Sequence, residues 1–316
     1  MNVVFMGTPE FACEGLNALA GSSHKVLAVV TVPDKPAGRG RKVMPSAVKN
    51  EALRLGVPVY QPEKLRDESF IAQMAALKPD AFVVIAFRIL PKSLYTIPRF
   101  GSFNIHASLL PKYRGAAPIN HAILNGETET GLTSFFLNKQ VDGGDIILQK
   151  SIAIDINENF SSLYGRLAEL SGPFLLETLE KIARPDFTAE KQPAGETSGA
   201  PKISTDDCLI DWSKPANTVH NHVRAFSEKP GAFSYLGAMK VKILATRLDG
   251  IDDSPALRPG ELAADKKQLL AGTDTEPVRI TKIQPEGKKA MDAVAFINGY
   301  MNSNRTELTA ERKEVK

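Results

Sequence analysis

The feature that most constrains the fold is an alternation of short apolar runs with amphipathic segments along the first third of the chain. The apolar runs are rich in Val, Ile and Phe, as buried strands are: Val3–Met6, Val26–Val32, Val57–Tyr60, Ala81–Ala86 and Phe103–Ile105. Apolar residues that recur every three or four positions between these runs predict helices over Phe11–Ala20, Pro45–Leu55 and Glu68–Leu77. Strands that alternate with helices predict an α/β fold, a Rossmann-like, doubly wound and mostly parallel sheet. The ligands of such sheets bind beyond the carboxyl ends of the strands.

A long helical pattern follows, and after it the pattern changes to that of a linker and then of short strands. The helical pattern spans Phe160–Ile182, and Gly172-Pro173 inside it predicts either a kink or a split. Ala189–Pro201 is dense in Pro, Gly, Ser, Thr and Glu, which predicts a linker. Later apolar runs have the spacing of a small antiparallel β-barrel of the oligonucleotide-binding (OB) type, with a sandwich as the alternative: Ala232–Leu236, Val241–Thr246, Gln268–Ala271 and Val278–Gln284. We predict a Rossmann-like domain over residues 1–188, a linker over 189–202 and an OB-like domain over 203–316.

The composition argues against several classes of protein. Cys13 and Cys208 lie far apart and the five histidines show no metal-ligand spacing, so we expect neither a disulfide framework nor a metal site. No apolar stretch approaches the ~20 residues that cross a bilayer, so we expect a cytoplasmic protein with no membrane partner. Pro9 stands where a GxGxxG fingerprint would need glycine, which argues against NAD binding. The net charge of +3 neither requires nor excludes a nucleic-acid partner.

Asn104 and His106 stand two residues apart at the end of a predicted strand. Side chains two apart on a strand point to the same side, so an amide and an imidazole would be presented together. Polar groups placed there need a partner or a substrate, because their burial without one costs free energy. The two residues are either part of a catalytic site or polar core residues that hold the following turn.

Asp142 lies in a glycine-bearing turn, Val141-Asp142-Gly143-Gly144-Asp145-Ile146, after the apolar run Leu132–Leu137. Glycines let the backbone approach a ligand closely, and the acid is then available to a nearby imidazole. Alternatively, Asp142 only closes a β-turn, since Asp-Gly is a common turn dipeptide. Neither this segment nor the preceding one decides the function alone.

Together these segments carry a family resemblance. Three of them resemble the signature of the formyltetrahydrofolate-dependent formyltransferases: Asn104-Ile105-His106, Ser108-Leu109-Leu110-Pro111-Lys112-Tyr113-Arg114-Gly115 and Asp142-Gly143-Gly144-Asp145. Others are similar to the branch of that superfamily that acts on methionyl-tRNA: Gly115–Ile119, Met6–Ala12, Pro33–Arg41, Ile210–Trp212, Arg224–Phe226 and Gln284–Met291. The resemblance covers nearly the whole chain. It implies transfer of a formyl group from 10-formyltetrahydrofolate to the amino group of methionine on initiator methionyl-tRNA.

The resemblance also implies the site residues. It places a catalytic trio on Asn104, His106 and Asp142, in which the amide donates to the oxyanion. His106 would donate to the same oxygen or protonate the departing folate nitrogen, and Asp142 would orient His106. Two loops would line the folate pocket: Ser108, Leu109, Leu110 and Pro111 in one, and Phe87, Arg88, Ile89 and Leu90 in the other. Phe87-Arg88 departs from the Tyr-Gly of several relatives, and Arg88 can equally be a surface ion-pairing residue.

Basic residues gather in two segments for which the resemblance implies tRNA binding. The Gly- and Pro-rich stretch Pro33–Lys49 carries several cations and one acid, Asp34, and is either a tRNA-gripping loop or a solvated surface loop. A dispersed basic face is expected on the second domain. The predicted tRNA-binding residues are Lys35, Arg39, Arg41, Lys42, Lys288 and Lys289. We expect a monomer.

Two other functions remain open. One is a formyltransferase that acts on a small amine, such as glycinamide ribonucleotide or an amino sugar nucleotide. The other is a non-catalytic tRNA-binding protein that retains the fold. The basic loop and the second domain argue against the former, and the presence of the whole trio argues against the latter.

Overall fold

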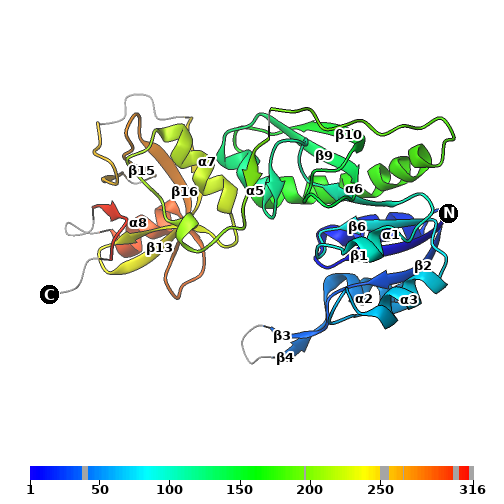
Figure 1. Cartoon of the computed structure of the whole chain (residues 1–316). Helices are drawn as coiled ribbons and strands as arrows, with labels where there is room; N and C mark the ends of the chain where they lie inside the picture. Colours follow the sequence, from blue (N-terminus) through cyan, green and yellow to red (C-terminus); the bar gives the residue numbers. More distant parts are fainter. Residues whose placement is uncertain (38–41, 196, 250–255, 266, 302–305, 313–316) are drawn as a thin grey trace. The chain divides into compact units, whose positions relative to one another are not determined.

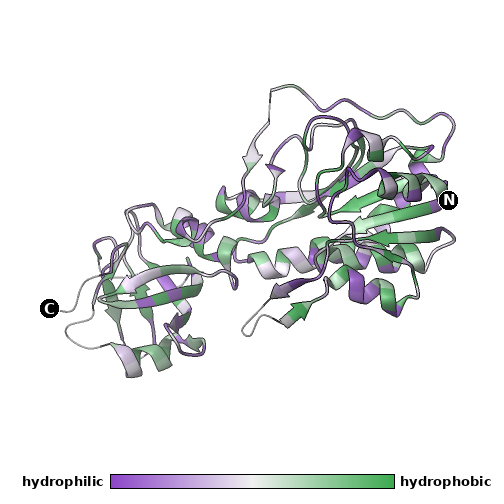
Figure 2. Cartoon of the chain, turned by 60° about the horizontal axis from the view of Figure 1, so that its bottom comes forward, coloured by the Kyte–Doolittle hydropathy of each residue, from purple (hydrophilic) through white to green (hydrophobic). Residues whose placement is uncertain are grey.

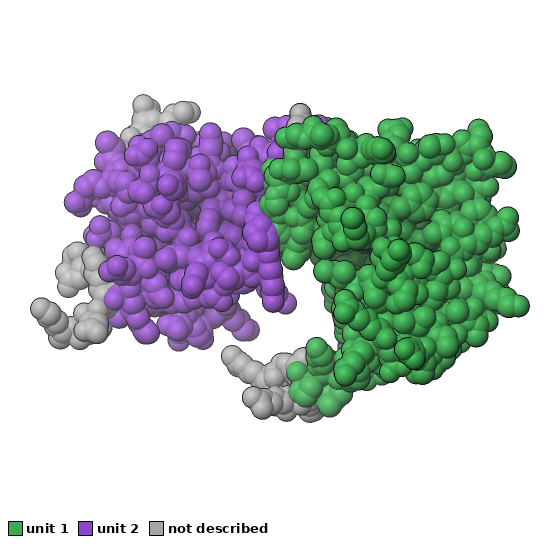
Figure 3. Space-filling view, in the orientation of Figure 1, with its two compact units in different colours: residues 1–118, 130–152, 164–200 green, residues 119–129, 153–163, 201–316 purple. Residues whose placement is uncertain are grey.

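The computed structural model describes residues 1–37, 42–195, 197–249, 256–265, 267–301 and 306–312. It divides into two compact units, which Figure 3 draws in different colours. Unit 1 contains residues 1–118, 130–152 and 164–200, and unit 2 contains residues 119–129, 153–163 and 201–316. Two short segments, residues 119–129 and 153–163, therefore belong to the same unit as the C-terminal part of the chain.

Unit 1 is built on a seven-stranded sheet with the order β10-β9-β7-β6-β1-β2-β5 (Figure 1). Its strands are β1 (Asn2–Gly7), β2 (Lys25–Val30), β5 (Val59–Tyr60), β6 (Ala81–Ile85), β7 (Ser102–His106), β9 (Glu129–Phe136) and β10 (Ile146–Ala153). The strands from β5 to β7 pair in parallel, and β9 runs antiparallel to β7. The strand order reverses between β1 and β6, and such a reversal marks the ligand-binding edge of an open α/β sheet.

Helices cover both faces of this sheet. They are α1 (Phe11–Ala20), α2 (Ala47–Arg54), α3 (Glu68–Ala76), α4 (Lys92–Tyr95) and α6 (Phe160–Ile182). Val4 of β1 packs with Met74 of α3, whereas the neighbouring Phe5 lies against Gly15 of α1. Successive side chains of a strand point to opposite faces, so a strand covered on both faces must be apolar throughout. The central strand β6 is accordingly apolar throughout, and so is β1 after Asn2, the strand that follows the N-terminus and is coloured as hydrophobic in Figure 2.

Smaller elements complete unit 1. A hairpin of β3 (Lys35–Ala37) and β4 (Lys42–Met44) precedes α2, and β8 (Arg114–Gly115) pairs in parallel with β11 (Gly199–Ala200). The N–H of Glu190 also donates to the carbonyl of Ile146, and Ile146 returns the bond. The stretch predicted as a linker therefore makes backbone hydrogen bonds to unit 1 at both ends. Its predicted boundaries, and those of the two domains, stay a prediction.

Unit 2 contains an antiparallel sheet with the order β14-β15-β16-β13-β12-β18, with β17 paired to β16. Its strands are β12 (Ala232–Leu236), β13 (Met239–Arg247), β14 (Leu262–Ala264), β15 (Leu269–Ala271), β16 (Val278–Pro285), β17 (Met291–Asp292) and β18 (Leu308–Thr309). The N–H of Leu262 donates to Thr306, and that of Leu308 donates to Gly260, each over 2.7 Å. These bonds join the first and last strands, so the sheet is a nearly closed barrel.

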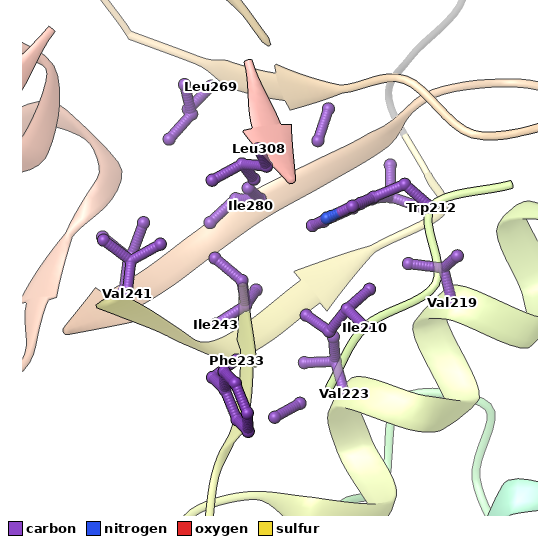
Figure 4. Close-up of a cluster of buried hydrophobic side chains, with 14 of the residues drawn as sticks. Ile210, Trp212, Val219, Val223, Phe233, Val241, Ile243, Leu269, Ile280 and Leu308 are labelled. Atoms are coloured by element: carbon purple, nitrogen blue, oxygen red, sulfur yellow. The ribbon is translucent and has the colours of Figure 1, made fainter. Parts of the chain in front are cut away.

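Helices pack around this barrel and share its core. They are α5 (Pro118–Leu124), α7 (Ala216–Phe226), α8 (Ala293–Tyr300) and the 3₁₀ helix η1 (Asp206–Cys208). Val219 and Val223 lie one turn apart on α7 and point toward Ile243 of β13 (Figure 4). The indole N–H of Trp212 donates to Ser234 Oγ over 3.0 Å, so the buried ring keeps a hydrogen-bond partner.

The predicted fold class, a Rossmann-like α/β domain followed by a small β-barrel, is confirmed. The predicted helices Phe11–Ala20 and Phe160–Ile182 coincide with α1 and α6. Of the two outcomes predicted at Gly172-Pro173, a kink or a split, the split does not occur, because α6 continues with Pro173 inside it. No helix of the described residues is long and apolar enough to cross a membrane.

Candidate active site

The candidate site begins at the carboxyl end of β7. Asn104 and His106 occupy alternate positions there, while Phe103 and Ile105 are buried on the opposite side of the strand. The amide of Asn104 is half-buried and makes no hydrogen bond within the described part of the chain. It is therefore available to a ligand at this edge.

The ring of His106 is held by the segment that follows. Its Nε2 lies 2.8 Å from the carbonyl oxygen of Tyr113, and the side chain is only 6% exposed. Because a carbonyl oxygen can only accept, Nε2 carries the proton of this bond. In the neutral ring the lone pair is then on Nδ1, which is the atom left for a substrate.

Asp142 reaches the same segment from the turn between β9 and β10. Its carboxylate Oδ2 accepts a hydrogen bond from the N–H of Gly115 over 2.9 Å. Tyr113 and Gly115 are separated by one residue, so their Cα atoms are at most about 7 Å apart. Asp142 and His106 are thus brought close together through one short segment, although no hydrogen bond joins their side chains in the described structure.

Two glycines permit this close approach. Gly115 has φ +127°, and a Cβ there would lie 2.5 Å from the carbonyl oxygen of Ala200. A Cβ on Gly144 would lie 1.6 Å from the carbonyl oxygen of Phe136. Asp142 itself has φ +49°, a left-handed conformation that Asp adopts more readily than most residues. The turn therefore requires small residues and places Asp142 at its most constrained position.

The loop after β7 is fixed from inside the protein. Ser108, fully buried, donates its hydroxyl to the carbonyl of Lys112, and its own carbonyl accepts from Thr133 Oγ1, each over 2.7 Å. Thr133 Oγ1 also accepts from the N–H of Leu110 and from Gln149 Nε2, which in turn donates to the Leu110 carbonyl. The polar groups of Ser108 and Leu110 are thus engaged within the protein. Leu109 is the half-exposed member of Ser108–Pro111, and Pro111 is buried.

The loop Phe87–Leu90 leaves β6 at the same edge of the sheet. Ile85 pairs with Ile105, so the residues after β6 begin beside His106. Arg88 donates to the carbonyls of Pro62 and Glu63 over 2.8 and 3.1 Å, and makes no ion pair with the described residues. Burial lowers the pKa of Arg88 from its usual value. Arg88 is therefore partly buried in the loop, unlike a solvated surface cation.

A pocket of about 340 Å³ opens beside this loop. It is lined by Lys64, Leu65, Arg66, Arg88, Ile89, Leu90 and Pro91. Apolar walls with a few charged groups suit a ligand that has a flat apolar part and an anionic end. Ile89 is 77% exposed, and such a ligand would bury much of its apolar surface.

The predicted tRNA-binding residues are placed only in part. Lys35 is exposed at the start of β3, and Lys42 opens β4, whereas Arg39 and Arg41 lie outside the described residues. Lys288 and Lys289 are exposed in the turn between β16 and β17. The structure thus leaves Lys35, Lys288 and Lys289 exposed at the surface.

Comparison with known sequences decides the family. The model of the family "Formyl transferase" matches residues 1–179, and that of "Formyl transferase, C-terminal domain" matches residues 202–301. The chain is 43% identical over 313 residues to methionyl-tRNA formyltransferase of Porphyromonas gingivalis, covering 96% of this chain and 97% of that protein. It is 44% identical over 302 residues to methionyl-tRNA formyltransferase of Citrifermentans bemidjiense, covering 95% of this chain and 94% of that protein. This chain belongs to the methionyl-tRNA formyltransferase family.

The predicted resemblance and the predicted class of enzyme, a formyltransferase, are thereby confirmed. Solved structures share the fold of this family member. An N-formyltransferase from Helicobacter canadensis, solved with folinic acid and dTDP-3-aminofucose, aligns with a TM-score of 0.65 at 22% identity, over 88% of this chain and 98% of its own. HypX from Aquifex aeolicus, solved with tetrahydrofolic acid, aligns with a TM-score of 0.61 at 19% identity, over 95% of this chain and 47% of its own.

Several residues that support the candidate site were not singled out from the sequence. Gln192 donates to the carbonyls of Asp142 and Gly144, and Thr133 and Gln149 hold the loop after β7. Thr133 carried one weak signal, a hydroxyl within an apolar strand. Gln192 carried none, because it lies in the stretch predicted as a linker and its partners are about 50 residues away in sequence.

Proposed function

We propose that this protein transfers the formyl group of 10-formyltetrahydrofolate to the free amino group of methionine on initiator methionyl-tRNA, and that Asn104, His106 and Asp142 form its catalytic site. The observation that carries the proposal is the near full-length identity to proteins named methionyl-tRNA formyltransferase, through both matched domains. His106 and Asp142 both form hydrogen bonds with the short segment Tyr113–Gly115, which supports the assignment of the site.

The reaction is an acyl transfer. The amine attacks the formyl carbon and forms a tetrahedral oxyanion, the bond from that carbon to N10 of the folate breaks, and the amine loses a proton that N10 gains. The unpartnered amide of Asn104 can donate to the oxyanion, and removal of one such donor typically lowers kcat by roughly 10²–10³. The negative charge of the oxyanion then develops next to the Asn104 amide, which is already in place to donate.

His106 suits the proton transfers of this reaction. Its Nε2–H is occupied by Tyr113, so Nδ1 can accept the proton of the attacking amine and, once protonated, deliver it to the departing N10. Asp142 would stabilise the transient imidazolium from nearby, since an opposite charge within a few ångströms favours the charged form. A group positioned in this way contributes on the order of 10²–10⁴ to the rate.

The two substrates would occupy different parts of the protein. The folate would lie along Phe87–Leu90 and Ser108–Pro111, with the exposed Ile89 and half-exposed Leu109 among the apolar contacts. The tRNA would meet the basic segments, which contain Lys35, Arg39, Arg41, Lys42, Lys288 and Lys289. We propose that the enzyme acts as a cytoplasmic monomer.

The decisive experiment offers purified protein 10-formyltetrahydrofolate and a panel of acceptors. We expect formylation of initiator methionyl-tRNA and little of elongator methionyl-tRNA or glycinamide ribonucleotide. Formylation of a small amine in preference to tRNA would identify the alternative formyltransferase. Tight tRNA binding without product from any acceptor would identify a non-catalytic protein.

A further inference from the structure

Gln192 lies between two parts of the candidate site that are distant in sequence. Its Nε2 donates to the carbonyl oxygens of Asp142 and Gly144 over 2.9 and 2.8 Å. Its Oε1 accepts from Arg114 Nε over 3.2 Å and from Arg114 Nη2. One side-chain amide therefore connects the segment that contacts His106 with the turn that presents Asp142.

The orientation of this amide is fixed by its partners. Both N–H groups face carbonyl oxygens, which only accept, and the oxygen faces a guanidinium, which only donates. Rotation of the amide by half a turn would place its oxygen against two carbonyls and its N–H groups against the cation. Every polar group of Gln192 is thus used, and a carboxylate of the same shape could satisfy only the Arg114 side.

On its β9 side the Asp142–Gly144 turn is held by the N–H of Phe136, which donates to the carbonyl of Asp145 over 2.9 Å, and by the close approach of Gly144 to Phe136. Among the described residues, it has fewer connections toward the loop that contacts His106. Residues 138–141, which lead into it, are all exposed, so no buried side chain anchors them. The contacts of Asn138 with Gln140 and Gly143 lie within the turn itself. Hydrogen bonds from Gln192 and Gly115 are accordingly the main connections from the turn to the loop that contacts His106.

The segment that carries Gln192 is itself held on both sides. Glu190 exchanges two backbone hydrogen bonds with Ile146, of 2.6 and 2.9 Å. Ser198 accepts from the N–H of Tyr113 through Oγ and from the N–H of Arg114 through its carbonyl, each over 2.9 Å. The side chain of Gln192 is therefore presented from backbone that is paired to both parts of the site.

We propose that Gln192 is a positioning residue for formyl transfer, which together with Arg114 holds the Asp142–Gly144 turn so that the Asp142 carboxylate faces the reacting amine. This inference rests on the proposed function and extends it to a segment outside the family signature. In this proposal Gln192 acts through Asp142 and not through contact with a substrate. Its loss should therefore reduce kcat while KM for tRNA and folate stays close to that of the wild type.

Gln192→Ala is expected to lower kcat by about 10- to 100-fold, the range that a misplacement of about 1 Å in a catalytic group can produce. Gln192→Glu should be no better than Gln192→Ala, although it keeps a partner for Arg114, because it cannot donate to the two carbonyls. Lys191→Ala, an exposed neighbour on the same segment, is the matched control and should behave as the wild type. Circular dichroism establishes that each variant is folded before kinetics are compared.

A double-mutant cycle separates positioning from general destabilisation. If Gln192 acts through Asp142, Gln192→Ala should cause no further loss of kcat in an Asp142→Ala background. An equal fold-loss in both backgrounds would overturn the inference, and so would a Gln192→Glu variant with wild-type kcat. A wild-type protein that formylates no acceptor would instead refute the proposed function, and an unimpaired Asp142→Ala would refute the assignment of Asp142.

Discussion

The hydrogen bond between His106 Nε2 and the carbonyl of Tyr113, 2.8 Å long, determines which ring nitrogen is left for chemistry. A proton on Nε2 leaves the lone pair of the neutral ring on Nδ1. The partner that fixes the tautomer is thus a backbone group of the following segment, whereas the family resemblance implied that Asp142 orients His106. In the structure, Oδ2 of Asp142 accepts from the N–H of Gly115.

His106→Ala should reduce kcat for formylation by about 10²–10⁴, because it removes the proposed acid–base group. Affinity for charged tRNA should stay nearly unchanged, since the proposed tRNA contacts lie on other segments. Initial-rate kinetics and a filter-binding assay measure the two quantities. His24→Ala is a suitable control, because His24 directly precedes β2 at the amino end of the sheet. Equal loss of activity and tRNA affinity in His106→Ala would show that His106 is structural.

Asn104→Ala should lower kcat by roughly 10²–10³ through loss of one donor to the oxyanion. Its side chain makes no hydrogen bond within the described residues, so the substitution should leave the melting temperature almost unchanged. Single-turnover rates with saturating folate and tRNA isolate the chemical step. An Asn50→Ala variant carries the same change at an exposed position of α2 and controls for effects of protein preparation. A rise in KM alone, with kcat intact, would assign Asn104 to binding.

The sheet and the strand that carries Asn104 and His106 could be predicted because their signals are local. Apolar runs and helical periodicity identified β1, β6, β7, α1 and α6, and the alternation along Phe103–His106 placed Asn104 and His106 on one side. The antiparallel direction of β9 could not be predicted, since it depends on which neighbour the strand finds.

The support of the site escaped prediction for a related reason. Gln192, Thr133 and Gln149 act through contacts with residues 16 to 78 positions away, and a lone polar residue gives no sign of such a partner. The Pro- and Gly-rich composition around Gln192 predicted a linker. It could not indicate that this stretch is hydrogen-bonded to unit 1.

Two glycine substitutions in unit 1 should have opposite effects on stability. Gly144→Ala would place a methyl group 1.6 Å from the carbonyl oxygen of Phe136, so the Asp142 turn must shift. Gly165→Ala introduces a methyl into open space within α6, where it should stabilise by about 0.5–1 kcal/mol. Scanning calorimetry should therefore show a lower melting temperature for Gly144→Ala and a slightly higher one for Gly165→Ala. If the two variants melt alike, the close approach at Gly144 is not as described.

The basic loop of residues 33–49 should contribute to tRNA binding through phosphate contacts. Arg41→Ala is expected to weaken binding of charged tRNA and to reduce the slope of log K against log salt by up to about 0.7–0.9 per lost contact. Binding titrations at several salt concentrations measure this slope. Lys49→Ala is a useful comparison, because Lys49 pairs with Asp34 and should contribute less to the phosphate contacts. An unchanged slope in Arg41→Ala would remove this residue from the interface.

His220 connects three segments of unit 2 from a fully buried position. Its Nε2 donates to the carbonyl of Ile156 over 2.9 Å, and its Nδ1 lies 2.8 Å from Thr246 Oγ1. Burial is the main cause that lowers the pKa of His220 below its usual 6.5. The hydrogen bond to the Ile156 carbonyl opposes this effect, the charges of Arg224 and Arg247 lower the pKa further, and that of Asp249 raises it. The folded protein therefore keeps this imidazole neutral at a pH where an unfolded chain would protonate it.

Unit 2 should consequently lose stability as the pH falls below 6.5. In that range the unfolded state binds a proton that the folded state does not, so the free energy of unfolding decreases with decreasing pH until the lowered pKa of His220 is reached. The contribution of one histidine is at most about 1.4 kcal/mol per pH unit.

Trp212, the only tryptophan of the chain, is buried in the core of unit 2, so its fluorescence reports the unfolding of this unit by urea. Below pH 6.5, His220→Gln should show a flatter dependence of the urea midpoint on pH than the wild type. His222, whose pKa is also lowered by burial, is present in both proteins. Parallel curves for the two proteins would mean that His220 is protonated equally in the folded and unfolded states.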